Sequence, residues 1–276
     1  MSDTPTLFAN EIPSQKNGLE NKRDVEVAIE RDDCMSFLEG LPSGSVDVLT
    51  TDPAYSGMNQ HLQLGEGRIV GKYADAGEQN GKWFEEFRDT EENYRRFLEA
   101  CKHALSARGH LYIMFDSYSM LSLGDLVREY FDVKNIIVWD KVNWGMGHYY
   151  RRRHEFILFA TNGNTRKLRN QSFPDVWRFK RIYRAPYSTQ KPVELFQAMV
   201  YASTEKGYTV CDPFLGSGSA AIASIKNECR FVGCDISMEA IDLARERVDV
   251  YRRTGKDPLQ PKPASIKGGK VFWKES

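Results

Sequence analysis

Four consecutive residues, Asp52-Pro53-Ala54-Tyr55, combine groups that could hold a flat substrate with an amino group. They follow a short β-branched run at 46–51, and ligands of open α/β sheets bind outside the carboxyl ends of the strands. The Asp52 carboxylate and the Pro53 carbonyl can each accept an N–H hydrogen bond, and the Tyr55 ring can stack on the substrate. Asp-Pro also ends strands in ordinary turns. The segment alone therefore supports a substrate site and a plain turn equally.

A second segment, Val210-Cys211-Asp212-Pro213-Phe214-Leu215-Gly216-Ser217-Gly218-Ser219, predicts a ligand loop between a strand and a helix. Gly216 and Gly218 have no Cβ, so a ligand can approach the backbone closely. The next strand ends at Asp235, roughly 20 residues later, where an acidic side chain binds ribose hydroxyls in nucleotide folds. A lone Gly-x-Gly can also serve tight strand–helix packing. Its pairing with Asp235 favours a cofactor that contains a nucleoside.

A third segment, Ser188-Thr189-Gln190-Lys191-Pro192, precedes an expected helix and supplies hydroxyls, an amide and a cation. These groups near a helix N-terminus suit a carboxylate ligand, because the first backbone N–H groups of a helix have no partner within it. By itself, the same segment is also consistent with an ordinary helix start.

The elements that must position these segments alternate between strand and helix. Short, nearly continuous apolar runs predict strands at 46–51, 110–115, 133–139, 155–161, 208–212 and 230–235. Helical spacing of apolar residues predicts a helix through Tyr94, Phe97 and Leu105, and others beginning near Pro192 and Ser237. This alternation predicts an α/β fold with a doubly wound, mainly parallel sheet.

The chain is expected to form one catalytic domain over 25–253. The polar residues 1–24 predict a flexible arm, and the proline-rich and glycine-rich residues 254–276 predict an extended tail. Two segments interrupt the alternation inside the domain. One is a glycine-rich polar loop at 57–90, and the other is a basic and aromatic stretch at 164–187. Long loops in compact domains are usually functional, and a basic, aromatic stretch suits contact with nucleic acid.

The composition excludes several classes of protein. Lys and Arg number 38 against 38 Asp and Glu, which excludes a general polycation such as a histone-like DNA binder. A hydrophobic content of 41% and a charged content of 28% are typical of a soluble globular chain, and no apolar run is long enough for a membrane helix. Five cysteines without a CxxC pair predict reduced thiols, with no disulfide frame and no metal site. We therefore expect a cytoplasmic protein.

Taken together, the three segments resemble the motifs of the permuted β class of DNA amino-methyltransferases. The shared features are Asp-Pro-x-Tyr, then Thr-Gln-Lys-Pro, then Asp-Pro-Phe-x-Gly-Ser-Gly, in that order. Other similar stretches are 32–34, 41–47, 139–141, 145–147 and 152–160, so the resemblance covers nearly the whole chain. It implies a Rossmann-like methyltransferase fold with a doubly wound, mostly parallel seven-stranded sheet, one antiparallel strand and a permuted motif order. The chain departs from the family at Ala54, where a second proline is common, and at Tyr187-Ser188, where His-Pro is common.

The resemblance also implies roles for individual residues. The implied catalytic residues are Asp52, Pro53 and Tyr55. The implied ligands of the cofactor, S-adenosyl-L-methionine, are Asp33, Asp52, Ser188, Thr189, Gln190, Lys191, Asp212, Pro213, Phe214, Gly216, Gly218, Ser219, Asp235 and Ile236. The implied DNA contacts are Arg151, Arg152, Arg153, Arg166, Lys167, Arg169, Arg178, Lys180, Arg181 and Arg184.

The implied reaction is methylation of an exocyclic amine on a base flipped out of double-stranded DNA. Asp52 favours adenine N6, because the cytosine-N4 members more often carry Ser at that position. Protein-glutamine members carry Asn there, which disfavours a protein substrate. Cytosine-N4 methylation and a catalytically silent DNA-binding subunit of the same fold stay open as alternatives. A homodimer and a cognate restriction endonuclease are the protein partners that the family suggests.

Overall fold

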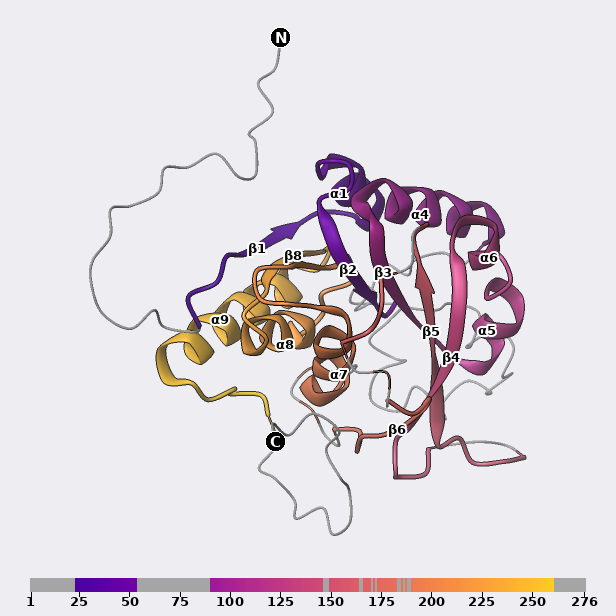
Figure 1. The fold of residues 1–276 in the computed structure, drawn as a ribbon. Coiled ribbons are helices and arrows are strands. Elements are labelled where there is room, and N and C mark those ends of the chain that lie inside the picture. The colour runs from indigo at the N-terminus through magenta and orange to yellow at the C-terminus, as the bar shows by residue number, and fades with distance from the viewer. Residues whose placement is uncertain are drawn as a thin grey trace, which may run out of the picture.

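The protein is built around one mixed β-sheet (Figure 1). The computed structural model describes residues 23–53, 90–145, 149–163, 166–169, 171, 173–182, 185, 187 and 190–260. In these ranges eight strands lie in the order β1-β8-β7-β2-β3-β5-β4-β6. Their bounds are β1 Val27–Arg31, β2 Val46–Thr51, β3 Leu105–Phe115, β4 Asp132–Asp140, β5 His154–Thr161, β6 Val176–Arg178, β7 Thr209–Asp212 and β8 Arg230–Asp235.

Among the described strands, β5 is the one that runs against its neighbours. It pairs antiparallel with both β3 and β4, whereas the other pairings are parallel. This arrangement confirms the predicted α/β fold with a mostly parallel sheet and one antiparallel strand. The described sheet has eight strands, whereas the family resemblance implied seven and the apolar runs located six, without β1 and β6. The three-residue β6 pairs with the outer edge of β4, and it is too short to show an apolar pattern of its own.

Seven helices are described, and most begin at a side chain that satisfies free backbone N–H groups. Asp33 caps α1 (Cys34–Gly40), Thr90 caps α4 (Glu91–Ala104), Asp116 caps α5 (Ser117–Leu123) and Ser237 caps α9 (Met238–Thr254). The others are α6 (Val127–Tyr130), α7 (Val193–Ser203) after Pro192, and α8 (Ser219–Lys226) after Gly218. The helices predicted near Pro192 and Ser237 therefore begin where the sequence placed them.

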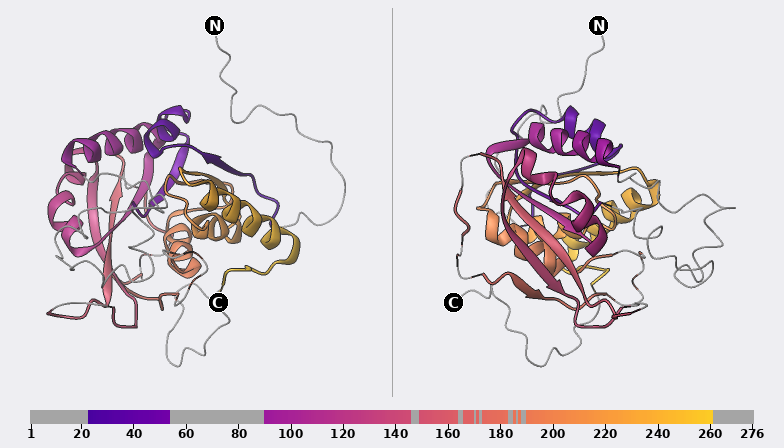
Figure 2. Two further views of the ribbon diagram at one scale, coloured as in Figure 1. Left: turned by 180° about the vertical axis from the view of Figure 1, so that it is seen from behind. Right: turned by 90° about the vertical axis from the view of Figure 1, so that its right-hand side faces the viewer.

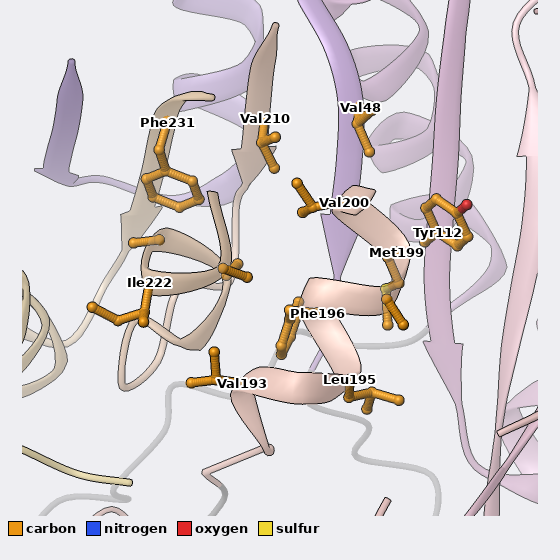
Figure 3. Close-up of a cluster of buried hydrophobic side chains, with 14 of the residues drawn as sticks. Val48, Tyr112, Val193, Leu195, Phe196, Met199, Val200, Val210, Ile222 and Phe231 are labelled. Carbon is orange, nitrogen blue, oxygen red and sulfur yellow. The ribbon is translucent and has the colours of Figure 1, made fainter. Parts of the chain in front are cut away.

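Helices cover both faces of the sheet, as the views in Figure 2 show. Buried side chains from α1, α4 and α6 form one hydrophobic cluster, and those from α7, α8 and α9 form the other. Successive residues of β2 serve both, because Val48 belongs to the second cluster and Leu49 to the first. Figure 3 shows Val48 and Val210 of the sheet facing the helical side chains of Phe196, Val200 and Ile222. Burial on both faces explains why β2 and β7 are nearly continuous apolar runs.

The strands that carry the first and the last of the three motifs, β2 and β7, are neighbours in the sheet. These strands are far apart in the sequence but pair in parallel, with Val48 opposite Val210 and Leu49 opposite Cys211. The element that follows β7, α8, covers one face, whereas α4, which is described next after β2, covers the other. In doubly wound sheets, ligands bind at the point where neighbouring strands lead to helices on opposite faces of the sheet. Asp52 and Asp212 consequently emerge side by side at the same edge.

The flanking segments are described only in part. Most of the predicted arm (1–24), most of the predicted loop (57–90) and residues 261–276 lie outside the described residues. The first part of the predicted tail, 254–260, is described; most of its residues are exposed, and two contacts hold it against the domain. Asp257 is fully buried against Arg247, and the Leu259 carbonyl accepts a hydrogen bond from Gln190. No helix in the described ranges is long and apolar enough to cross a membrane.

Candidate active site

Asp52 lies directly after β2 and forms an ion pair with Lys191, which lies two residues before α7. The fold thus joins two of the predicted motifs through their charged side chains. Both side chains are partly buried, with 23% of Asp52 and 17% of Lys191 exposed. Burial raises the pKa of the Asp52 carboxyl, and the Lys191 ammonium opposes that rise. Burial would lower the pKa of Lys191, but the carboxylates of Asp52 and Glu155 raise it.

Glu155 and Lys141 extend this ion pair into a longer row of charges. Glu155 is the second residue of β5, and its Oε2 lies 4.0 Å from the Lys191 Nζ. Its Oε1 accepts a hydrogen bond of 2.8 Å from the Lys141 Nζ, just past the end of β4. Burial would raise the pKa of Glu155, but the two ammonium groups lower it. We call Asp52, Lys191, Glu155 and Lys141 the charge chain, because acids and bases alternate along it.

Asp212 ends β7 beside this chain, and its side chain is fully buried. Its Oδ1 accepts a hydrogen bond of 3.0 Å from the Phe214 N–H. Burial raises the pKa of this carboxyl to about 8, and the negative charges of Asp52 and Asp235 add to the rise. A carboxyl in such surroundings ionises more readily when a cationic group lies next to it. Asp212 is therefore suited to a positively charged ligand.

The glycine loop after Asp212 has a backbone conformation that requires glycine at two positions. Gly216 and Gly218 have φ values of +49° and +78°, which an L side chain rarely adopts. A Cβ on Gly218 would also lie 3.0 Å from the Cβ of Ala244, so α8 could not approach α9 as closely. The Asp235 carboxylate holds this loop, because its Oδ2 accepts the Gly216 N–H at 2.9 Å and its Oδ1 accepts the Ser237 N–H at 2.9 Å. The Ile236 N–H also interacts with this carboxylate, which has about four acceptor sites and therefore keeps one for a ribose hydroxyl.

Asp33 lies at the same edge as Asp235, because β1 pairs with β8 and Arg31 lies opposite Asp235. One oxygen of Asp33 caps α1 and accepts the N–H groups of Met35 and Ser36, each at 3.1 Å. The Asp33 carboxylate thus serves the start of α1, and no described contact tests the predicted contact with a cofactor. That role stays a prediction.

Several other predicted cofactor residues support the loop and the residues around it. The Ser219 hydroxyl donates to the Lys191 carbonyl at 2.8 Å, and the Gln190 amide donates to the Leu259 carbonyl at 3.1 Å. The Gln190 Oε1 is buried and has no hydrogen-bond partner among the described residues. The Ile236 carbonyl accepts the Arg31 Nε–H at 3.1 Å. Tyr55, Ser188 and Thr189 lie outside the described residues.

The structure divides the predicted DNA contacts between two opposite edges of the sheet. Arg166 donates to the carbonyls of Asp47, Arg108 and Ser203, at the edge where β2 and β3 begin. Arg169 packs on the Tyr201 ring near the end of α7, with 4.5 Å between the guanidinium carbon and the ring centroid. Arg166, Lys167 and Arg169 therefore belong to the edge away from Asp52, and we do not include them in a DNA surface. The sequence placed them with the other basic residues because they share one segment.

The remaining basic residues lie at the edge that carries Asp52, except that Arg184 is outside the described residues. Asp140 at the end of β4 organises several of them. It binds Arg153 through two contacts of 2.6 and 2.7 Å, and its Oδ2 lies 3.4 Å from the Arg178 Nε. Parallel pairing of β6 with β4 places Arg178 opposite Asp140. Arg151 lies over the Trp144 ring at 5.3 Å, and Arg152 over the Tyr118 ring at 5.2 Å.

Three residues of this region were not identified as site residues from the sequence. Glu155 and Lys141 lie within stretches that match the family, but nothing in the sequence indicated that their side chains meet Lys191. The available signal for Glu155 was a single acid in an otherwise apolar strand. Tyr187 is buried close to the glycine loop, since a Cβ on Gly216 would lie 3.4 Å from its ring. Burial and the charge of Asp235 raise the pKa of the Tyr187 hydroxyl.

Comparison with known proteins identifies the family to which this chain belongs. Residues 46–246 match the family model N6_N4_Mtase, described as DNA methylase, and this range contains Asp52, the charge chain, the glycine loop and Asp235. The chain belongs to this DNA methylase family. The expectation of a DNA amino-methyltransferase, an enzyme family that uses S-adenosyl-L-methionine, is thereby confirmed at the family level.

The methylase is also similar to individual relatives along most of its length. It is 27% identical over 246 residues to the Type II methyltransferase M2.DpnII of Streptococcus pneumoniae, which covers 80% of this chain and 89% of the relative. The structure of the M1.HpyAVI–SAM complex superimposes with a TM-score of 0.57 at 20% identity, covering 80% of this chain and 99% of that one. The cytosine-N4-specific PvuII DNA methyltransferase superimposes with a TM-score of 0.59 at 12% identity, covering 83% and 92%. These structural likenesses establish the shared fold.

Proposed function

We propose that this methylase transfers a methyl group from S-adenosyl-L-methionine to N6 of a flipped-out adenine in double-stranded DNA. The observation that carries the proposal is the position of Asp52. Its carboxylate stands at the end of β2, beside the strand β7 that leads into the glycine loop. A hydrogen-bond acceptor for the target amine therefore adjoins the loop suited to a nucleoside cofactor. Alignment of two reactants in this way can supply most of the rate enhancement.

The residues after β2 explain how a weak nucleophile could react. The lone pair of the adenine amine is delocalised into the ring, so the amine attacks poorly. If the Asp52 carboxylate and the Pro53 carbonyl each accept one amino hydrogen, the nitrogen becomes pyramidal and its lone pair localises. Oriented acceptors of this kind stabilise the charge that develops as the nitrogen attacks. Asp52 is also placed to accept the proton that the methylated nitrogen must lose.

The described residues fit S-adenosyl-L-methionine, which when bound supplies a methyl group activated by a positively charged sulfur. Asp235 keeps acceptor capacity for a ribose hydroxyl, and Gly216 and Gly218 keep the loop open to close approach. We assign Asp212 and Phe214 to the methionine part of the cofactor, because a buried carboxyl such as Asp212 favours a cation beside it. The buried, unpaired oxygen of Gln190 is a further acceptor next to Lys191.

The modified base is tested by expressing the methylase in cells that lack DNA methylation and hydrolysing their DNA. Mass spectrometry of the nucleosides should detect N6-methyladenine, and DNA from cells expressing Asp52→Asn should provide the baseline. N4-methylcytosine without N6-methyladenine would overturn the choice of base in favour of the first alternative. DNA binding without either product, and without binding of S-adenosyl-L-methionine, would instead indicate a silent subunit. Sequencing that detects modified bases would report the target site in the same sample.

The DNA surface that we propose lies around the ends of β4 and β6. It contains the exposed Arg178 and Lys180 together with Arg151 and Arg152. Three exposed aromatic rings accompany them, since Trp144 is 60% exposed and Tyr149 and Tyr150 are each 93% exposed. Cations that contact phosphates and rings that stack on bases are a combination typical of nucleic-acid surfaces. This surface adjoins Asp52 through the charge chain.

Removing two cations from this surface should weaken DNA binding and make it less sensitive to salt. For Arg178→Ala with Lys180→Ala, we expect about a tenfold higher Kd. The slope of log Kd against log salt concentration should fall by about 1.8, because each cation that contacts a phosphate contributes about 0.9. Fluorescence anisotropy with a labelled duplex at several salt concentrations measures both quantities.

The matched control for this experiment is Lys167→Ala with Arg169→Ala. These residues come from the same basic segment but lie at the opposite edge of the sheet. Their replacement should leave the salt slope within error of the unmodified protein. If both double variants lost DNA affinity and salt slope equally, the DNA surface would not lie at the ends of β4 and β6.

A further inference from the structure

The charge chain contains a feature that the proposed chemistry alone does not require. The sequence placed Lys191 beside the carboxylate of the cofactor, but its ammonium group contacts Asp52. A lysine in this position competes with the target amine for the carboxylate, and it also keeps that carboxylate charged. How strongly Lys191 binds Asp52 therefore affects how readily Asp52 can accept the amino hydrogens.

Glu155 and Lys141 are placed to set the strength of that contact. Lys191 lies between two acids, in contact with Asp52 and 4.0 Å from the Glu155 Oε2. Lys141 occupies the other Glu155 oxygen at 2.8 Å. Lys141 thereby reduces the pull of Glu155 on Lys191. The four side chains are only 13 to 25% exposed, so water screens their charges weakly.

We propose that Glu155 and Lys141 are positioning residues, which act through Lys191 in opposite directions: Glu155 draws Lys191 away from the Asp52 carboxylate, and Lys141 limits that pull so that Lys191 keeps the carboxylate oriented for the target amine. This inference rests on the proposed function, since it assigns Asp52 to the reaction. Neither Glu155 nor Lys141 needs to touch the substrate. They come from β5 and from the end of β4, whereas Asp52 and Lys191 come from β2 and the start of α7. Four separate parts of the fold thus converge on one catalytic carboxylate.

The proposal predicts effects of opposite sign for the two residues. Removing the Glu155 charge removes a negative charge near Asp52. The Lys191 ammonium then has Asp52 as its one acidic partner in the charge chain, so the pKa of Asp52 should fall. Removing the Lys141 charge frees Glu155 to attract Lys191, so the pKa of Asp52 should rise. Other charged groups facing the chain are Asp212, which faces Asp52, and Arg181, which faces Glu155. Both are unchanged in these variants.

The test compares Glu155→Gln and Lys141→Met with the unmodified protein in two measurements. The first is the single-turnover rate of methyl transfer between pH 5 and 9, with saturating cofactor and DNA. Because ionised Asp52 is the active form, the rate falls as the pH drops through its pKa. We expect this acid limb to move down by about one pH unit for Glu155→Gln and up by about one unit for Lys141→Met. Lys134→Met, at the other end of β4, is the matched control and should not move the limb.

The second measurement is independent of activity. Carbon-13 NMR of labelled aspartate carboxyls, with the Asp52 signal assigned from Asp52→Asn, reports the pKa of Asp52 in each folded variant. We expect the two variants to shift the pKa of Asp52 in opposite directions in both measurements. We also expect the acid limb to return towards its original position when Glu155→Gln and Lys141→Met are combined. Shifts of the same sign, or no shift in either measurement, would overturn the proposal and leave a purely structural ion-pair network. Opposite NMR shifts in a protein that transfers no methyl group would confirm the coupling and reject the proposed function instead.

Discussion

Replacing Asp52 by Asn should lower the rate of methyl transfer by about 10³-fold, which is the scale of effect seen when one oriented polar group is removed from a reaction centre. The variant keeps the shape of the side chain but loses its negative charge. The amide accepts a hydrogen bond more weakly than a carboxylate and cannot take up the proton that the methylated amine must lose. Lys191 also loses the carboxylate that it contacts. Binding of S-adenosyl-L-methionine should be largely unaffected, because Asp212, Asp235 and the glycine loop are unchanged.

Asp47→Asn is the matched control for this variant. Asp47 lies on the same strand β2 but near its beginning, where its Oδ2 accepts the Thr209 N–H at 2.9 Å. Asparagine keeps an oxygen for that contact, so transfer should remain close to that of the unmodified protein. Single-turnover transfer of a radiolabelled methyl group measures the rates, and isothermal titration calorimetry measures cofactor binding. If Asp52→Asn retained more than about a tenth of the original rate, Asp52 would not be the acceptor that activates the target amine.

Replacing Arg247 by Met should destabilise the folded protein by about 3–5 kcal/mol, because it leaves a buried charge without its partner. Arg247 is 1% exposed and binds both oxygens of the fully buried Asp257 at 2.8 Å. Its remaining amino group donates to the Ser217 carbonyl at 2.8 Å, inside the glycine loop. Met fills a similar volume but satisfies neither the Asp257 carboxylate nor the Ser217 carbonyl. The same change should weaken binding of S-adenosyl-L-methionine, because the loop loses a support.

Urea denaturation measures the loss of unfolding free energy, with Arg253→Met as the control. Arg253 is exposed on the same helix α9, so its replacement should change the unfolding free energy by no more than about 0.5 kcal/mol. Combining Arg247→Met with Asp257→Leu should recover part of the stability, because no unpaired charge then remains buried. A loss of less than about 1 kcal/mol for Arg247→Met alone would mean that the ion pair is not a principal support of the loop.

Local patterns in the sequence were sufficient to predict most of the described fold. Strands β2, β7 and β8 are short apolar runs between turns, and α9 begins at a serine that caps it, so neighbouring residues carry the information. The strands β1 and β6 were both missed, and the three residues of β6 gain their strand geometry from pairing with β4 rather than from their own pattern. The contact that anchors the start of the predicted tail was missed for a similar reason. Asp257 pairs with Arg247, which lies ten residues earlier on α9, and no local pattern in the sequence predicts that contact.

The candidate site was predictable to different degrees. Asp52, Asp212, Gly216, Gly218 and Asp235 were identified because each stands at the end of a strand or in the loop that follows, and parallel strands bring these ends to one edge. The basic segment at 164–187 was predicted as one surface, although it runs from one edge of the sheet to the other. Arg166 therefore lies near Asp47 at the beginning of β2, whereas Arg178 lies beside Asp140 at the end of β4.

The sequence by itself determined the family, the class of fold, the order of the motifs and the acid that we propose faces the target base. These properties depend on residue type, on spacing and on whether a residue ends a strand. Only the tertiary structure decided that Lys191 contacts Asp52, that Glu155 and Lys141 complete the charge chain, and which arginines share the edge that carries Asp52. The energy of a buried charge depends on the distance to other charges and on the loss of water around it. Both quantities arise when segments far apart in the sequence pack together, so they cannot be read along the chain.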